Sequence, residues 1–139
     1  MVDASVVSKW VLSGENYEEN AAKLKAEYVA GNVDLSAPSF MVQEVTNSIW
    51  KAIKQKRITL ETAQSALENL DALQINLYCI NWMEACEELA IAAKNDLTVY
   101  DAAYLFLAEK MNAQVITADD KMCQKGKGQF RLLHLKDYV

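Results

Sequence analysis

YDAAYLFLAEKMNAQVITADD, residues 100–120, places carboxylates at the ends of the apolar elements that should build a core. Asp101 opens a stretch with the composition of a buried helix, and it shares a helical face with Leu105 and Ala108. Asp119 comes directly after QVITA, which has the composition of a buried strand. Acids at such positions need an explanation, because charged side chains are rarely buried without a partner.

Helical and extended patterns alternate along the rest of the chain. Apolar residues recur at helical spacing in residues 17–31, 39–56, 59–73, 83–95 and 98–111, and a short helix is expected at 120–125. Short apolar runs predict a very short strand that ends at Asp3, a strand followed by a turn in residues 32–38, and strands in residues 74–80, 113–118 and 130–135. This order predicts an α/β fold, a three-layer α/β/α sandwich with a mostly parallel central sheet. Ligands of such sheets bind at the carboxyl ends of the strands.

The composition fits a single domain over residues 1–139, with 52% hydrophobic and 24% charged residues. One proline and four glycines leave no visible linker. No apolar run approaches the roughly 20 residues that cross a bilayer, and no signal sequence opens the chain, so we expect a cytoplasmic protein without a membrane partner. The cysteines Cys79, Cys86 and Cys123 have neither the spacing of a disulfide framework nor that of a zinc finger.

The net charge of -5 and the pI of about 4.9 argue against a nonspecific DNA-binding protein. Such proteins gain their affinity from lysine and arginine side chains that neutralise phosphates. An acidic chain can still act on nucleic acid if its acids gather around bound cations. The positions of the acids therefore decide whether the chain can act on nucleic acid.

Each acid also has a purely structural interpretation. Thr98 can cap the helix that Asp101 opens, and the Asp101 carboxylate can reach back to the helix N-terminus. Asp3 and Asp119 can cap the short helical segments that follow them. Glu44 can be an ordinary boundary residue beside the apolar stripe of its helix. Taken one at a time, these interpretations remain open.

The joint pattern is more specific than any single acid. Asp3 and Asp119 follow strands, whereas Asp101 opens a helix on its inner side and Glu44 borders a buried helical stripe. In a parallel sheet these side chains can converge on one cleft. Carboxylates brought together repel one another unless a cation neutralises them, and ligands that are all oxygen favour Mg2+ or Mn2+.

Three motifs contain these acids: VDASVVSKWVL with Asp3, APSFMVQEVTNSIWKAI with Glu44, and LTVYDAAYLFLAEKMNAQVITADDKM with Asp101 and Asp119. Together they resemble the PIN-domain family of metal-dependent ribonucleases, in particular its VapC-type toxins. The resemblance runs along essentially the whole chain. The first strand departs from the family pattern, because only two residues precede Asp3.

The resemblance implies an endoribonuclease that depends on Mg2+ or Mn2+ and serves as the toxin of a toxin–antitoxin pair. The four acids would be its catalytic residues and would hold the metal ion. Ser5 and Thr117 would hydrogen-bond to these acids without contacting the ion. An RNA substrate, a cognate antitoxin protein and a homodimer are also implied. Trp50 and Ile53 offer apolar positions on which two copies could meet.

The main alternative is a PIN-fold module that binds RNA or a partner protein with little or no catalysis. A receiver domain or an aspartyl-phosphate phosphatase is disfavoured, because each needs an acidic pair or Asp-x-Asp where this chain has DAS after its first strand. His134, the only histidine, is expected to be structural. Lys121, Lys125 and Lys127 form either a solvated face or a contact to RNA phosphate.

Overall fold

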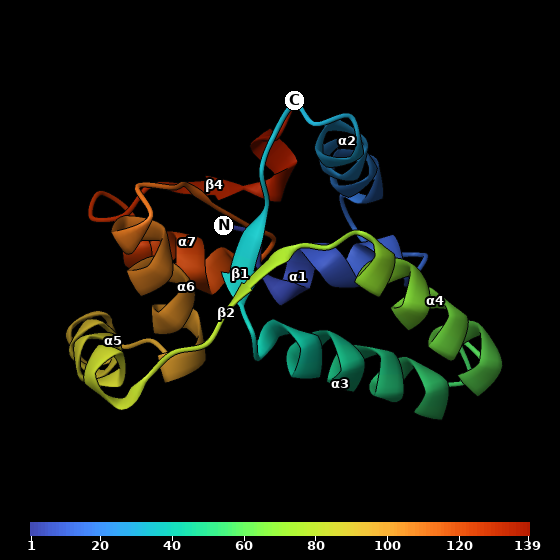
Figure 1. Cartoon of the computed structure of the whole chain (residues 1–139), viewed down its shortest axis with the longest axis horizontal. Helices are drawn as coiled ribbons and strands as arrows, with labels where there is room; N and C mark the ends of the chain where they lie inside the picture. The colour runs from blue at the N-terminus through green and yellow to red at the C-terminus, as the bar shows by residue number, and fades with distance from the viewer.

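A computed structural model describes all 139 residues as alternating helices and strands (Figure 1). The helices are α1 (Ala4–Val7), α2 (Glu18–Val29), α3 (Met41–Lys54), α4 (Leu60–Ala72), α5 (Trp82–Asn95), α6 (Val99–Lys110) and α7 (Asp120–Gly126). The strands are β1 (Ser36–Pro38), β2 (Asn76–Tyr78), β3 (Val115–Thr117) and β4 (Leu132–His134). Two 3-10 turns, η1 (Ser8–Trp10) and η2 (Leu135–Asp137), complete the chain.

Every strand pairing in the molecule is parallel. β1 pairs with β2, and β3 pairs with β4. The N-terminal segment joins these two pairs, because Val2 bridges Ile116 in parallel and donates its N–H to the Ser36 carbonyl at 2.9 Å. The order across the sheet is therefore β2, β1, the Val2 segment, β3 and β4, which confirms the predicted parallel sheet.

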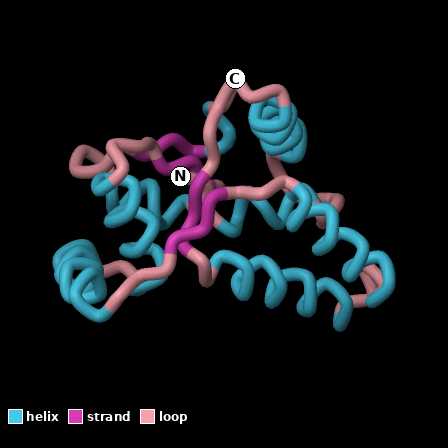
Figure 2. Tube along the Cα trace, viewed as in Figure 1, coloured by secondary structure: helices cyan, strands magenta, loops and turns pink.

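Helices cover both faces of this sheet. α5, α6 and α7 lie on one side of the strands, and α1, α3 and α4 lie on the other (Figures 1 and 2). α6 contacts β1 and β3, and α1 contacts β3 from its own side. The predicted three-layer α/β/α arrangement is thus confirmed.

The strands are shorter than the predicted apolar runs. Residues 74–80 yield only Asn76–Tyr78, and residues 32–38 yield only Ser36–Pro38. β2 lies at the sheet edge, where it pairs on one side only and all of its residues are exposed. A strand extends only as far as a neighbour runs alongside it, so composition alone overestimates its length.

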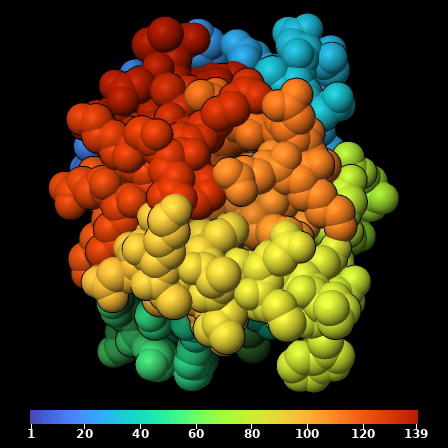
Figure 3. Space-filling model, turned by 90° about the vertical axis from the view of Figure 1, so that its left-hand side faces the viewer, coloured from blue at the N-terminus to red at the C-terminus, as the bar shows by residue number.

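α6 is the central helix of the core. Its residues Ala102–Ala108 are all buried, which explains why this stretch looks apolar all round in the sequence. α5 packs against α6 and forms the yellow ridge on the face shown in Figure 3. None of the helices has the combined length and apolar composition needed to cross a membrane.

Candidate active site

Asp3 lies at the centre of the candidate site, directly after the central segment of the sheet. Its side chain is only 4% exposed. The backbone of Asp3 is extended and its Oδ1 accepts the Val6 N–H at 3.3 Å, so Asp3 is the N-cap of α1, as the structural interpretation predicted. The Val6 N–H is not the only donor to this carboxylate, because two hydroxyl groups also donate hydrogen bonds to it.

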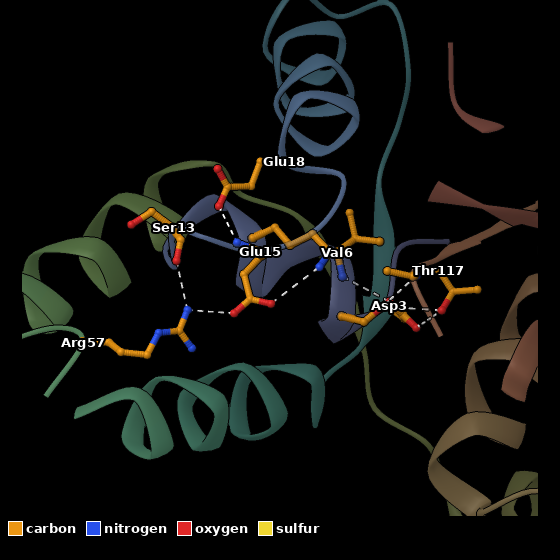
Figure 4. Close-up of polar contacts among 10 residues, drawn as sticks. Asp3, Val6, Ser13, Glu15, Glu18, Arg57 and Thr117 are labelled. Atoms are coloured by element: carbon orange, nitrogen blue, oxygen red, sulfur yellow. Dashed lines mark hydrogen bonds and ion pairs between the residues drawn. The ribbon is translucent and has the colours of Figure 1, made fainter. Parts of the chain in front are cut away.

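Ser5 and Thr117 hold Asp3 between them. Ser5 Oγ donates to Asp3 Oδ1 at 2.5 Å. Thr117 Oγ1 donates to Asp3 Oδ2, and Figure 4 shows these two side chains facing each other. The same two hydroxyl oxygens accept backbone N–H groups at 2.9 Å, Ser5 from Ala118 and Thr117 from Asp119. Each hydroxyl therefore has a fixed donor direction, and together they fix the orientation of the carboxylate.

Asp119 follows β3 at the level where Thr117 faces Asp3. It is the N-cap of α7, and its Oδ1 accepts the N–H groups of Lys121 at 2.8 Å and Met122 at 3.2 Å. These bonds use one carboxylate oxygen, so Oδ2 has no donor in the structure. The capping role predicted for Asp119 is real, and it leaves an oxygen free for a ligand.

Asp101 stands in the first turn of α6, where Thr98 is the N-cap and accepts the Asp101 N–H at 3.1 Å. Its side chain is half-buried. The negative charge of Asp119 raises the pKa of Asp101, and the charge of Asp101 raises the pKa of Glu44 on α3. Thr98 supplies the cap of α6, and Asp101 is the first-turn acid whose charge acts on the other acids.

Glu44 is partly buried on α3 and has a partner that the sequence patterns did not identify. Tyr104 of α6 donates its hydroxyl to Glu44 Oε1 at 2.7 Å. Tyr104 lies one turn after Asp101 and is only 1% exposed. A tyrosine in an otherwise apolar buried helix needs a partner for its hydroxyl, and that signal in YDAAYLFL could have pointed to this contact.

The electrostatics of the site are those of unneutralised acids. Burial raises the pKa of Asp3 to about 6, against hydrogen bonds that lower it, and the charge of Asp119 adds to the rise. Burial also raises the pKa of Glu44 and of Asp101, and each is raised further by a neighbouring carboxylate. None of the ion pairs in the molecule includes any of these acids.

A divalent cation suits this donor set, which consists of oxygen atoms that repel one another. The charges of these acids act on one another in successive pairs, Asp3 with Asp119, Asp119 with Asp101 and Asp101 with Glu44. No three histidine, cysteine or acidic side chains are close enough together to hold one ion. Side-chain rotation toward a shared position would be needed to complete the coordination.

The raised pKa of Asp3 predicts how stability depends on pH. In metal-free protein, the favourable contribution of protonated Asp3 is fully present below pH 3.8 and is lost as the pH rises through about 6. The loss is on the order of 3 kcal/mol. Urea unfolding in EDTA across this range should therefore show a smaller pH-dependent loss of stability in Asp3→Asn than in the wild type. Parallel curves for the two proteins would contradict the prediction.

The remaining polar residues near the acids have structural partners. Lys125 binds the Asp96 backbone carbonyl and lies 3.2 Å from its carboxylate, whereas Lys121 and Lys127 are exposed. His134 is buried and its Nδ1 accepts the Lys136 N–H at 3.0 Å, in line with the expected structural role. Its Nε2 lies 3.2 Å from Asp120 Oδ1 without hydrogen-bond geometry, so we regard this as a close approach only.

Known proteins are similar to this chain in sequence and architecture. A family model described as PIN domain matches residues 1–128. The chain belongs to the PIN domain family. This PIN domain is 30% identical to Ribonuclease VapC3 of Pyrobaculum aerophilum over 129 residues, which cover 90% of this chain and 92% of that protein. It is 25% identical to Ribonuclease VapC9 of Mycobacterium tuberculosis over 96 residues, which cover 68% of this chain and 72% of that one.

The fold of this PIN domain also matches a solved structure. The crystal structure of PAE2754 from Pyrobaculum aerophilum superimposes with a TM-score of 0.67 at 22% identity, and the match covers 97% of this chain and 89% of that one. The resemblance to VapC-type PIN domains drawn from the three acidic motifs is thereby confirmed.

Proposed function

We propose that this PIN domain is a metal-dependent endoribonuclease, the toxin of a VapBC-type toxin–antitoxin pair. The observation that carries the proposal is the row formed by Asp3, Asp119, Asp101 and Glu44. Successive members interact through their charges, and none has a cationic partner in an ion pair. The curated relatives named as VapC ribonucleases support the same activity.

Asp3, Asp101 and Asp119 would hold Mg2+ or Mn2+, with Glu44 as a direct or water-bridged fourth ligand. The ion, when bound, neutralises the phosphate and activates a water molecule. Ser5 and Thr117 keep Asp3 oriented, so this ligand need not reorganise when RNA enters.

Glu44 is suited to orient the attacking water. Its Oε1 is bound by Tyr104, its Oε2 has no donor, and burial raises its pKa. A carboxylate whose pKa is shifted toward neutrality is a better proton acceptor at working pH than an ordinary exposed glutamate. Attack by water would leave a 5′-phosphate on the product.

Metal removal tests the proposal. Purified protein should cleave single-stranded RNA in Mn2+ or Mg2+, lose activity completely in excess EDTA, and recover it when either ion is returned. Complete loss is expected because the ion would both neutralise the phosphate and activate the attacking water. Cleavage by clean protein that persists in EDTA would refute the metal-dependent mechanism.

One observation favours the alternative of a binding module with little catalysis: no three acids are yet placed to hold an ion together. Calorimetry with Mn2+ separates the two functions. Metal binding with RNA cleavage supports the nuclease, whereas RNA binding without metal binding or cleavage supports the module.

The RNA and the antitoxin would meet the protein on the side of the acids. Lys121 in the first turn of α7 and Lys127 at its C-terminal end are exposed and offer contacts to RNA phosphate. A cognate antitoxin would place a basic side chain against the unpaired carboxylates. The product of an adjacent gene should then suppress cleavage when the two proteins are expressed together. If no adjacent gene product suppresses cleavage, the antitoxin part of the proposal is refuted.

A homodimer is part of the proposal, and α3 and α5 both offer apolar surface for its interface. Trp50 is 52% exposed and Ile53 is partly buried on α3. The larger apolar exposure lies on α5, where Trp82 is 91% exposed, Met83 78% and Leu89 61%. Light scattering at high protein concentration checks the dimer, and a monomer there would contradict it.

A further inference from the structure

Tyr104 is a buried residue that joins two parts of the site. It stands on α6 one turn after Asp101, and its hydroxyl donates to Glu44 Oε1 on α3 at 2.7 Å. One phenol therefore connects the helix of Asp101 to the helix of Glu44.

The ring of Tyr104 has little freedom to move. It is 1% exposed, and the ring of Phe40 packs against it edge to face with centroids 5.8 Å apart and planes at 85°. The Tyr104 hydroxyl donates to Glu44 Oε1 and to no other acceptor. A fixed donor of this kind determines where its acceptor lies.

We propose that Tyr104 is a positioning residue that orients the Glu44 carboxylate for metal binding. The hydroxyl engages Oε1 and leaves Oε2 without a donor, so one oxygen is anchored and the other is available. The inference rests on the proposed function, because it needs a metal ion at these acids. The competing interpretation is that the bond merely satisfies a buried phenol and has no bearing on the ion.

Tyr104→Phe tests the proposal, because it removes one oxygen and keeps the ring. Mn2+ affinity measured by calorimetry should fall about 10- to 100-fold, the usual effect of removing a group that orients a metal ligand. Tyr138→Phe is the matched control, since it removes a phenol that donates to Glu27, a carboxylate outside the site. The control should bind Mn2+ like the wild type, and thermal unfolding should show that both variants are folded.

A double-mutant cycle with Glu44→Gln separates positioning from packing. If Tyr104 acts through Glu44, adding Tyr104→Phe to Glu44→Gln should change Mn2+ affinity less than about 3-fold. An equal loss in both backgrounds, or no loss in either, would overturn the inference. Failure of the wild type to bind Mn2+ would instead refute the proposed function.

Discussion

Asp101→Asn and Asp119→Asn are each expected to lower RNA cleavage by orders of magnitude while the protein stays folded. Asparagine has nearly the same volume as aspartate and caps helices about as well, so the caps of α6 and α7 should lose well under about 1 kcal/mol. The cation, in contrast, loses a charged ligand. Metal-free stability should be unchanged or higher, because carboxylate repulsion is relieved.

Cleavage rate, Mn2+ affinity and urea unfolding should be measured on the same preparations. Asp120→Asn is the matched control, because Asp120 stands one residue further along in α7 and points its carboxylate to solvent and His134. The control should cleave at the wild-type rate. Near-normal cleavage by both test variants would mean that Asp101 and Asp119 serve only the starts of α6 and α7, as a first-turn acid and as an N-cap.

Removal of the hydroxyl groups that hold Asp3 is expected to give the next largest loss. Ser5→Ala and Thr117→Val should each lower cleavage and Mn2+ affinity about 10- to 100-fold. Both substitutions free the Asp3 carboxylate to rotate, and each also leaves a backbone N–H, of Ala118 or Asp119, without its acceptor. The double variant should lose less than the product of the single effects, because both hydroxyls act on one carboxylate.

Ser8→Ala and Thr46→Val are the matched controls for these substitutions. The Ser8 hydroxyl is buried without a hydrogen-bond partner, and the Thr46 hydroxyl donates only to the Val42 carbonyl of its own helix. Neither is expected to change cleavage or metal affinity. Equal losses in the controls and the test variants would show a general effect on folding rather than an effect on Asp3.

The order of elements was predictable because period and composition are local properties. The sequence places Asp3 and Asp119 after strands and Asp101 in the first turn of a helix, and the structure has each of them there. Sheet handedness and parallel pairing then bring strand ends to one edge. The neighbourhood of these three acids thus follows from a few general rules, and their role as metal ligands stays a prediction.

The partners of individual side chains were not predictable in the same way. The Tyr104–Glu44 bond joins residues 60 positions apart, and no pattern within either helix specifies the other. Lys125 was a candidate for RNA contact, yet it binds Asp96, whose left-handed backbone at the end of α5 turns its carbonyl toward the lysine. Such contacts depend on how helices meet, which the period of one helix leaves open.

The central position of the Val2 segment has a consequence for synthesis on the ribosome. The first residues of the chain form the middle of the sheet, and Asp3 meets Thr117 across 114 positions. Contacts of such long sequence separation form slowly, because the intervening chain must be ordered first. A nascent chain therefore carries no assembled acidic site until β3 has emerged. Refolding experiments in which Mn2+ binding lags behind helix formation would reveal this late assembly.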